Sequence, residues 1–456
     1  MALESINPKN KKLIKTFDEL SEKQIDEKLS AAQTAFETMR DSSFSERAGW
    51  MRKAARNLRE RKTELARIIT DEVGKTLAAS EAEIEKCAGT CEYYADNAEK
   101  FLSLEKVDTD AGESYVRFDP IGIVLAVMPW NFPFWQVFRF AAPAIMAGNV
   151  GVLKHASNVQ MSGFAIEDVF KNSGFPDNVF QNLCISSSKV EAVIRDGRVK
   201  AATLTGSEKA GSAVAAEAGS VIKKTVLELG GSDPFIVLAD ADIDASVNAA
   251  VTARLQYNGG QSCIAAKRFI VDEKVIDEFT GKLKEAVDKL TVGDPTDPHT
   301  DVGPLVNEQM VEDLDRQIKE SEKMGAKLVT GGKAEGSEGY YFNPAIITGL
   351  TPDMPVLNEE TFGPAFAIVP VKDADEAINM ANSSEYGLGA NIFTADTGYA
   401  KDYIAPKIES GAVFINGPIK SDPRLPFGGV KKSGYGRELS HYGIKEFVNI
   451  KTVWVK

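Results

Sequence analysis

In the N-terminal third of the chain, apolar residues recur three and four positions apart, the period of helices that bury one face. The spacing predicts helices over residues 21–39, 44–74 and 78–104. The first helix opens with Ser21 and Gln24, the spacing of a capping box. Dense charge pairs four residues apart on the two longer helices indicate solvated outer faces. This part of the chain shows no candidate chemistry by itself.

The pattern changes near residue 114. Residues 114–119 alternate like a strand, and residues 121–128 form a continuous apolar run, which is typical of a buried strand. From there strands and helices alternate, which predicts an α/β fold with a parallel sheet covered on both faces. The expected strands are residues 150–154, 180–184 and 201–204, and the expected helices are residues 133–147, 161–172, 189–196 and 208–218.

A second α/β region follows Leu229-Gly230-Gly231. Asp242 can cap one helix, and a second helix is expected at residues 275–290. Strands are expected at residues 268–271, 365–371 and 411–416. Residues 446–455 also read as a strand, too exposed to leave unpaired, so we expect them to form an oligomerisation arm with residues 114–119.

Charge and composition narrow the classes of partner. The 456 residues carry a net charge of −13, from 66 acidic and 53 basic residues, which argues against nucleic-acid and anionic membrane partners. The longest apolar region, residues 121–153, contains Asn131, Arg139, Pro143 and Asn149 and is not expected to cross a bilayer. Residues 1–15 are polar and lysine-rich, unlike a secretory signal.

Cysteine and histidine usage gives the expected setting. The four cysteines are too few for a disulfide framework in so long a chain, so we expect a reducing cytoplasm. Cys87 and Cys91 share a helix face, but the three histidines lie far off in sequence, so no metal site is expected.

Candidate functional residues follow several expected strands, where α/β sheets bind ligands. Asn131 carries an amide that could hold an oxyanion. Lys154 could contact a ribose or a phosphate, and the segment from Gly206 to Gly211 offers backbone amides to a pyrophosphate. Taken singly, such residues are more often turn, cap or surface positions.

Two acidic residues and a cysteine add to this set. Glu228 ends an apolar strand, where burial tends to raise a carboxyl pKa and suits a general base. Glu360 could accept bonds from ribose hydroxyls, and Phe362 could pack on a flat heterocycle. Cys263 stands in a loop that begins Asn258-Gly259-Gly260, where adjacent glycines let a sulfur be presented at close range. A lone free cysteine is more often an inert core residue.

Together these segments resemble the aldehyde dehydrogenase superfamily, from about Ser21 to the C-terminus. Within it the chain is most similar to the succinate-semialdehyde dehydrogenases. The motifs that carry the resemblance, in family order, are Pro129-Trp130-Asn131-Phe132-Pro133, Gly206 to Gly211, Glu228-Leu229-Gly230-Gly231, Asn258 to Cys263, Glu359 to Pro364, and Pro426 to Gly429 with Lys432-Ser433-Gly434.

The resemblance implies an architecture and a set of roles. It implies a Rossmann-type cofactor domain in residues 1–101 and 121–230, a catalytic domain in residues 231–441, and a β-arm in residues 102–120 and 442–456 that joins a homodimer or homotetramer. It makes Cys263 the nucleophile, Glu228 the base that activates water, and Asn131 an oxyanion donor. The implied cofactor contacts are Met128, Pro129, Trp130, Lys154, Ala156, Ser157, Gly206, Ser207, Leu229, Glu360 and Phe362.

The resemblance also bears on substrate and cofactor. Arg139 matches an arginine that binds the far carboxylate of succinate semialdehyde, whereas Tyr257 stands where a second family arginine is found. Arg254 is nearby but out of register, so we expect Ser421 and Arg424 to supply contacts. Arg139 could instead form a structural ion pair, and glutarate semialdehyde and aliphatic aldehydes remain alternative substrates.

Ser157 replaces the glutamate that many NAD-preferring relatives use to exclude a 2′-phosphate. We therefore expect NADP to be preferred and NAD to be accepted. The motifs leave two further classes open, a thioester-forming reductase and a binding protein that has kept the fold but lost catalysis.

Overall fold

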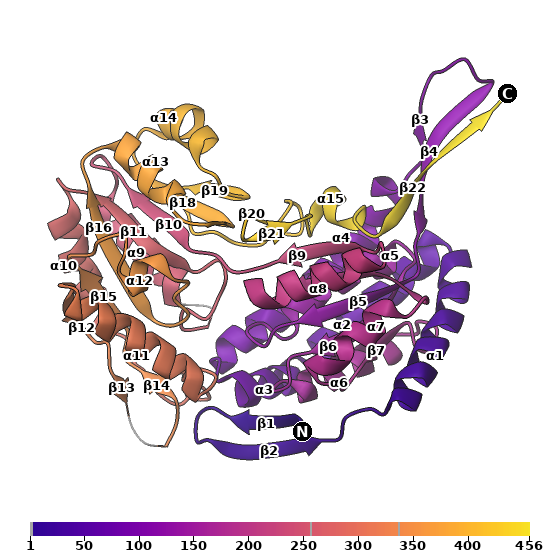
Figure 1. Ribbon diagram of the computed structural model, residues 1–456, viewed down its shortest axis with the longest axis horizontal. Coiled ribbons are helices and arrows are strands. Elements are labelled where there is room, and N and C mark those ends of the chain that lie inside the picture. Colours follow the sequence, from indigo (N-terminus) through magenta and orange to yellow (C-terminus); the bar gives the residue numbers. More distant parts are fainter. Residues whose placement is uncertain (1–2, 256–257, 336–337) are drawn as a thin grey trace.

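The computed structural model describes residues 3–255, 258–335 and 338–456. Two sheets of six and seven strands lie side by side and form the two halves of the molecule (Figure 1). A small sheet that ends at the C-terminus projects from the six-stranded half as an arm, and an N-terminal hairpin lies on the opposite side of that half (Figure 1).

The N-terminal third is helical, as expected. Ser21 and Gln24 form the predicted capping box. The predicted helix over residues 44–74 is two helices that meet at Arg61, where the backbone leaves helical geometry (φ −103°, ψ 14°). Arginine and lysine favour helices, so composition gave no sign of this break. The helices are α1 (Glu22–Asp41), α2 (Phe44–Glu60), α3 (Lys62–Val73) and α4 (Leu77–Phe101).

A hairpin precedes these helices. Its strands β1 (Leu3–Asn7) and β2 (Lys12–Phe17) pair antiparallel, and Leu3 and Phe17 are buried. The lysine-rich composition of this segment concealed the two strands.

The six-stranded sheet has the order β21-β9-β8-β5-β6-β7. Its first five strands in the chain are parallel and alternate with helices, and β21 runs antiparallel to β9. The strands are β5 (Ile123–Met128), β6 (Val150–His155), β7 (Phe180–Asn182), β8 (Val199–Thr205), β9 (Lys224–Glu228) and β21 (Gly434–Tyr435). The helices are α5 (Trp135–Met146), α6 (Gln160–Lys171), α7 (Val190–Arg195) and α8 (Glu208–Ser220).

The strand order creates a crevice between β5 and β8. The chain builds outward from β5 to β7 and then returns to place β8 on the other side of β5. Loops that leave two neighbouring strands in opposite directions open a crevice at the carboxyl edge of the sheet. The loops after β5 and β8 therefore lie at the position where this architecture binds ligands.

The seven-stranded sheet has the order β12-β15-β16-β11-β10-β18-β19. Its buried strands present alternate residues to two cores, and in β10 Phe235 and Val237 face one core while Ile236 faces the other. The strands are β10 (Asp233–Val237), β11 (Ala266–Asp272), β12 (Lys327–Thr330), β15 (Ala345–Thr348), β16 (Ala365–Val371), β18 (Gly389–Phe393) and β19 (Ala412–Ile415). The helices of this half include α9 (Ile243–Leu255), α10 (Ile276–Val287), α11 (Glu308–Lys323), α12 (Pro355–Asn358), α13 (Ala374–Asn382) and α14 (Thr397–Tyr399).

Short pairs of strands complete the fold. They are β13 (Ala334–Glu335) with β14 (Tyr341–Phe342) and β17 (Tyr386–Gly387) with β20 (Val430–Lys431). The arm contains β3 (Glu105–Lys106), β4 (Glu113–Pro120) and β22 (Val448–Val455), in the order β22-β4-β3, and α15 (Ser440–Ile444) leads into it. The two segments predicted to form an arm do pair, with Val448 opposite Pro120.

Candidate active site

Cys263 lies in a loop between α9 and β11, at the junction of the two halves. The loop needs glycine at residue 260, because its φ is +81° and a Cβ there would come within 2.1 Å of the Gly363 carbonyl oxygen. The close approach holds the loop of Cys263 against the segment that carries Glu360 and Phe362. Two sequence motifs far apart in the chain therefore form one surface.

Lys267 holds the backbone of the loop that contains Cys263. Its buried ammonium group donates hydrogen bonds to the carbonyl oxygens of Ser262 at 3.0 Å, Cys263 at 2.8 Å and Ala265 at 3.3 Å. The same Nζ lies 3.8 Å from Glu360 Oε1. Three carbonyls held by one cation orient the backbone around Cys263.

Asn131 is tied to the same loop. Its Nδ2 donates to the Gln261 backbone carbonyl oxygen at 3.2 Å, and the backbone carbonyl oxygen of Asn131 accepts a bond from Asn258 Nδ2 at 2.9 Å. An amide nitrogen carries two hydrogens, so one remains to be donated into the cavity. The structure thus brings the predicted oxyanion donor next to the predicted nucleophile.

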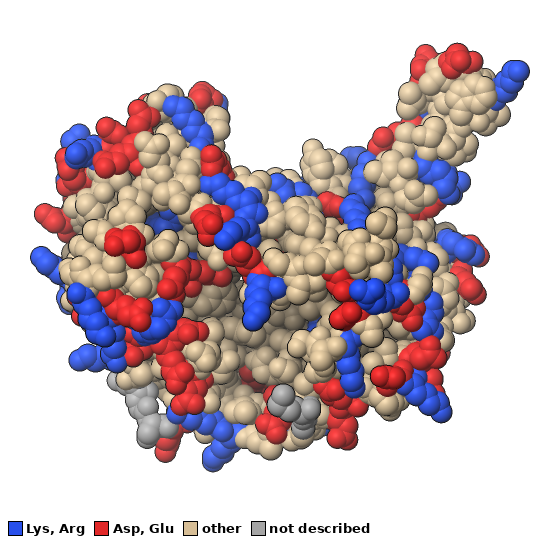
Figure 2. Space-filling model, viewed as in Figure 1, with Lys and Arg blue, Asp and Glu red and all other residues tan. Residues whose placement is uncertain are grey.

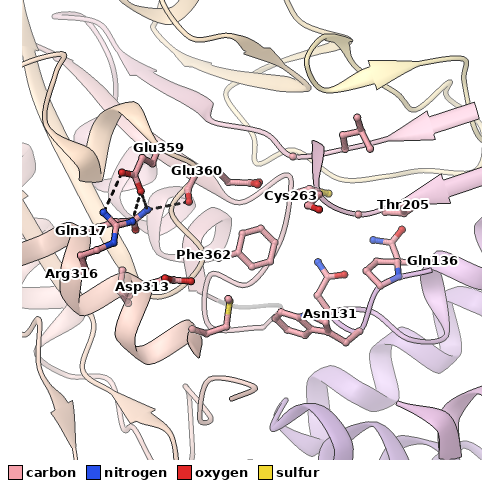
Figure 3. A pocket seen from close by; sticks show the side chains of 18 residues that line it. Asn131, Gln136, Thr205, Cys263, Asp313, Arg316, Gln317, Glu359, Glu360 and Phe362 are labelled. Carbon is pink, nitrogen blue, oxygen red and sulfur yellow. Dashed lines mark hydrogen bonds and ion pairs between the residues drawn. The ribbon is translucent and has the colours of Figure 1, made fainter. Parts of the chain in front are cut away.

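A cavity of about 370 Å³ lies between the halves, on the hollowed face of Figure 2. In Figure 3, Asn131, Gln136 and Cys263 lie on one side of this cavity, and Glu359, Arg316 and Gln317 lie on the other. Its lining includes residues from the loops after β5, β8 and β9, which is the edge predicted to bind the cofactor. The predicted residues in the lining are Pro129, Trp130, Asn131, Gly206, Ser207, Leu229, Cys263, Glu360 and Phe362.

The lining offers the groups that a dinucleotide needs. Glu360 lies in the lining, accepts a bond from the Gly231 amide at 2.8 Å, and has a pKa raised by burial. The rings of Trp130 and Phe362 meet edge to face with centroids 6.1 Å apart. Ser207 caps α8, whose first amides therefore face the cavity edge. These groups could contact a ribose, an apolar ring and a pyrophosphate.

Four predicted cofactor residues lie outside this lining. Met128 is buried at the end of β5, and Lys154 lies opposite Val127 on the neighbouring strand β6, with Ala156 and Ser157 after it. Lys154 is half-buried, and burial lowers its pKa. Within the described part of the chain, no carboxylate lies within 4.0 Å of its Nζ.

A second cavity, of about 260 Å³, shares Gln136 and Cys263 with the first. It is lined by apolar and aromatic side chains together with four cations and one carboxylate, that of Glu83. The lining includes Lys75, Lys86, Trp135, Arg139, Lys420, Ser421 and Phe427. Cys263 therefore lies between a cofactor-sized space and a smaller, positively charged one.

Arg139 lies at this second cavity but is already paired. It is only 1% exposed, its Nε forms an ion pair with Glu438, and its Nη2 donates to Thr205 Oγ1 at 3.3 Å. The guanidinium also stacks over Phe427. Its place in the lining is compatible with the predicted contact to a substrate carboxylate, and its pair with Glu438 matches the alternative, a structural ion pair.

Of the other predicted substrate contacts, one lines the second cavity and one does not. Ser421 lines the second cavity. Arg424 does not, because its side chain is 72% exposed and binds Asp422 at 2.6 Å. Arg254 is buried elsewhere, with bonds to the carbonyl oxygens of Ala266 and Thr361. Tyr257 lies outside the described residues.

Glu228 has the raised pKa that its position predicted. Desolvation raises the pKa of its fully buried carboxyl well above the ordinary value, Arg139 opposes the rise, and Glu438 adds to it. Its carboxyl lies against Gly428, where an added Cβ would come within 2.7 Å of Oε1, and is absent from both cavity linings. In this position the carboxyl does not line the space next to Cys263.

The Cys263 thiol is held mainly neutral. Burial raises its pKa to about 11, although Arg139 and Lys267 act in the opposite direction. The thiolate is the nucleophilic form of cysteine, so reactivity in this site requires a base or an added positive charge. Nucleophile, oxyanion donor and buried carboxyl together suit acyl chemistry at a carbonyl carbon.

Sequence reasoning missed several residues of the site. Gln136 and Thr205 line the cofactor cavity, as do Asp313, Arg316 and Gln317 of α11. Lys267 holds the loop of Cys263, and Lys86 lines the second cavity. The amphipathic pattern of α11 could have indicated a packed helix, but not which ligand it faces.

Two features are absent from the described residues. None of the helices in residues 3–255, 258–335 and 338–456 is both long and apolar enough to cross a membrane. The same part of the chain holds no cluster of three histidine, cysteine or acidic side chains arranged to bind a metal ion.

Comparison with known proteins gave full-length matches. A family profile described as the aldehyde dehydrogenase family matches residues 1–453. The probable succinate-semialdehyde dehydrogenase [NADP(+)] of Synechocystis sp. is 49% identical over 455 residues, covering 100% of both chains. Succinate-semialdehyde dehydrogenase [NADP(+)] 1 of Mycobacterium tuberculosis is 50% identical, again over 100% of both.

A solved structure also matches over the full length of the chain. The crystal structure of succinic semialdehyde dehydrogenase from Streptococcus pyogenes in complex with NADP+ superposes with a TM-score of 0.97. The two chains are 41% identical, and the match covers 100% of each.

Proposed function

The chain belongs to the aldehyde dehydrogenase family, and on that premise we propose that it oxidises succinate semialdehyde to succinate with NADP+. One observation carries the proposal beyond the family: Cys263 lies between the cofactor cavity and a second cavity with four cations in its lining. A positively charged cavity beside the nucleophile suits an aldehyde whose far end is a carboxylate.

The first step falls to Cys263 and Asn131. The Cys263 thiol gives its proton to a water molecule, and the sulfur then adds to the aldehyde carbon, so that the carbonyl π electrons move to the oxygen and a thiohemiacetal oxyanion forms. The free hydrogen of Asn131 Nδ2 and the backbone N–H of Cys263 stabilise the oxyanion, each contributing about 3 kcal/mol in comparable sites. When NADP+ is bound, its nicotinamide supplies the hydride acceptor that leaves a thioester on the sulfur.

Glu228 completes the cycle. After a change of rotamer, its carboxylate takes a proton from water, and the hydroxide attacks the thioester carbon. The carbon–sulfur bond breaks, succinate leaves, and the thiolate is regenerated. A buried carboxyl with a raised pKa suits this role, because it binds a proton from water more strongly than an exposed carboxylate does.

The charges around Lys154 suit the 2′-phosphate that distinguishes NADP+ from NAD+. Lys154 presents a half-buried cation, and no carboxylate of the described residues lies within 4.0 Å of its Nζ. In the segment Lys154-His155-Ala156-Ser157, which ends β6 and enters the following turn, the serine adds no negative charge. A phosphate on the 2′-position would therefore meet a cation there, and no acidic side chain of the turn would repel it.

We propose that the two halves have different functions and that the arm joins subunits. The six-stranded half would bind the cofactor, and the seven-stranded half would carry the nucleophile. The arm exposes Ile450, Trp454 and Val455 on β22, which lies at the edge of its sheet. Apolar side chains on an open edge strand favour pairing with another chain, which supports a homodimer or homotetramer.

A substrate-by-cofactor kinetic matrix tests the proposed function. Succinate semialdehyde, glutarate semialdehyde and butanal would each be assayed with NADP+ and NAD+, with Cys263→Ala as the control. We expect the highest kcat/KM for succinate semialdehyde with NADP+ and no turnover by the control. Equal kcat/KM for butanal would refute the substrate, and turnover by the control would refute the nucleophile.

A further inference from the structure

The second cavity holds one half-buried cation, Lys86, that forms no ion pair within the described residues. Lys75 pairs with Glu83 at 2.6 Å, Arg139 pairs with Glu438, and Lys420 is exposed. Lys86 is different, because no carboxylate of the described residues lies within 4.0 Å of its Nζ. An ammonium group removed from water without a counter-ion is costly, which makes this position unusual for a structural lysine.

Two lining residues hold Lys86 in place. Its Nζ donates to Ser421 Oγ at 2.7 Å and lies 4.0 Å from the centre of the Trp135 ring. These contacts orient the ammonium group but do not neutralise it. Two of its three hydrogens remain available to a ligand.

The Ser421 hydroxyl is oriented by the same contacts. Its oxygen accepts one bond from Lys86 and a second from Trp135 Nε1 at 3.1 Å. A hydroxyl oxygen has two acceptor positions and one hydrogen to donate. With both acceptor positions used, Ser421 must act as a donor toward any further partner. A cation and a hydroxyl donor thus stand together, which is the pair of groups that a carboxylate requires.

We propose that Lys86 is a specificity-determining residue that binds the carboxylate of the substrate, with Ser421 donating a second hydrogen bond to it. The inference rests on the proposed function and names a residue that binds the far end of the same substrate. It also accounts for Arg139, whose charge is already balanced by Glu438. Arg139 then shapes the cavity and stacks on Phe427, and the substrate carboxylate balances Lys86.

The protonation of Lys86 agrees with this role. Burial, followed by the charge of Arg139, lowers the pKa of Lys86 to about 7, with Lys75 acting in the same direction and Cys87 and Glu83 against it. A bound carboxylate favours the charged form and would raise this pKa again.

The test compares a charged substrate with its neutral isostere. Lys86→Met removes the charge and keeps most of the length of the side chain, Lys86→Arg restores a charge, and Lys100→Met changes an exposed lysine on the same helix α4. Each protein would be assayed with succinate semialdehyde and with 4-oxobutanamide, in which an amide replaces the carboxylate. Thermal melting would confirm that each variant folds.

We expect Lys86→Met to raise the KM for succinate semialdehyde about 10- to 100-fold, the usual effect of losing a hydrogen bond to a charged group. The kcat for succinate semialdehyde should stay within about twofold of the parent value. The kcat and KM for the amide should also stay within about twofold, since no charge pair is lost with a neutral ligand. Lys86→Arg should recover part of the affinity, and Lys100→Met should match the parent protein.

The outcomes separate the two proposals. If the parent protein shows no preference for the carboxylate over the amide, the proposed function itself fails. If the parent protein shows that preference and Lys86→Met leaves it unchanged, the inference about Lys86 is wrong while the function stands. Equal losses with both substrates would likewise overturn it, because they would show a structural role.

Discussion

Cofactor choice gives the sharpest quantitative prediction. Ser157→Glu would place a carboxylate two residues beyond His155, in the turn that follows Lys154. Its negative charge would pair with Lys154, whose Nζ has no carboxylate within 4.0 Å in the described residues, and would repel a 2′-phosphate. NAD+ has no phosphate there, and its free hydroxyl would gain an acceptor.

The size of the effect follows from the charges involved. Two unit charges about 4 Å apart interact by about 4 kcal/mol at the effective dielectric constant of a protein surface. Ser157 is exposed and Lys154 only half-buried, so solvent reduces this value to the range of about 1.5–3 kcal/mol typical of hydrogen bonds to charged groups. The ratio of kcat/KM for NADP+ over NAD+ should therefore fall about 10- to 100-fold.

The assay measures that ratio at low and high salt. Because the site is exposed, the shift should shrink as ionic strength rises. Ser45→Glu, at an exposed position of α2 far from the site in sequence, is the matched control for an added negative charge. A ratio that Ser157→Glu leaves unchanged, or that Ser45→Glu changes equally, would refute the assignment of the phosphate site to this turn.

Three further predictions concern buried titratable groups. The Glu228→Gln variant should form about one NADPH per active subunit and then stop, because the thioester is made but not hydrolysed. Steady NADPH formation in a stopped-flow assay would exclude Glu228 as the base. Cys263, with its pKa near 11, should react with iodoacetamide about tenfold faster per pH unit from pH 7 to 10, and a plateau below pH 8 would contradict the buried neutral thiol. His155 has a pKa lowered to about 4 by burial, against 6.5 unfolded, so the unfolded state binds more protons between these values and stability is lost as pH falls through this window. Between pH 7 and pH 4.5 this loss is about 2 kcal/mol, and it should be absent in His155→Gln when urea midpoints are compared at these two pH values; an equal loss in both proteins would contradict it.

Local patterns predicted what depends on local sequence. The capping box at Ser21, the alternation that begins at β5 and the motifs around Asn131, Glu228 and Cys263 could all be recognised, because each is a short run with its own physical requirement. The approach of Gly260 to Gly363 could not be foreseen, although the glycines themselves were visible. The sequence therefore indicated the parts of the site, and the fold shows how they meet.

Residues whose partners are distant in sequence were beyond this reasoning. Lys86 lies on an amphipathic helix with many charged residues, and only the tertiary fold places its ammonium group beside Ser421, 335 residues away. Arg424 does not line the second cavity, because it forms an ion pair with Asp422, two residues away in the sequence. The hairpin of β1 and β2 was missed because its strands are largely polar.

The central claim is that the sulfur of Cys263 becomes acylated by the substrate. Glu228→Gln protein would be mixed with succinate semialdehyde and NADP+, quenched in acid, digested and mapped by mass spectrometry. We predict one succinyl group on the peptide that contains Cys263 and none when NADP+ is omitted. A succinyl group on another residue, or NADPH formed without any adduct on Cys263, would contradict the account.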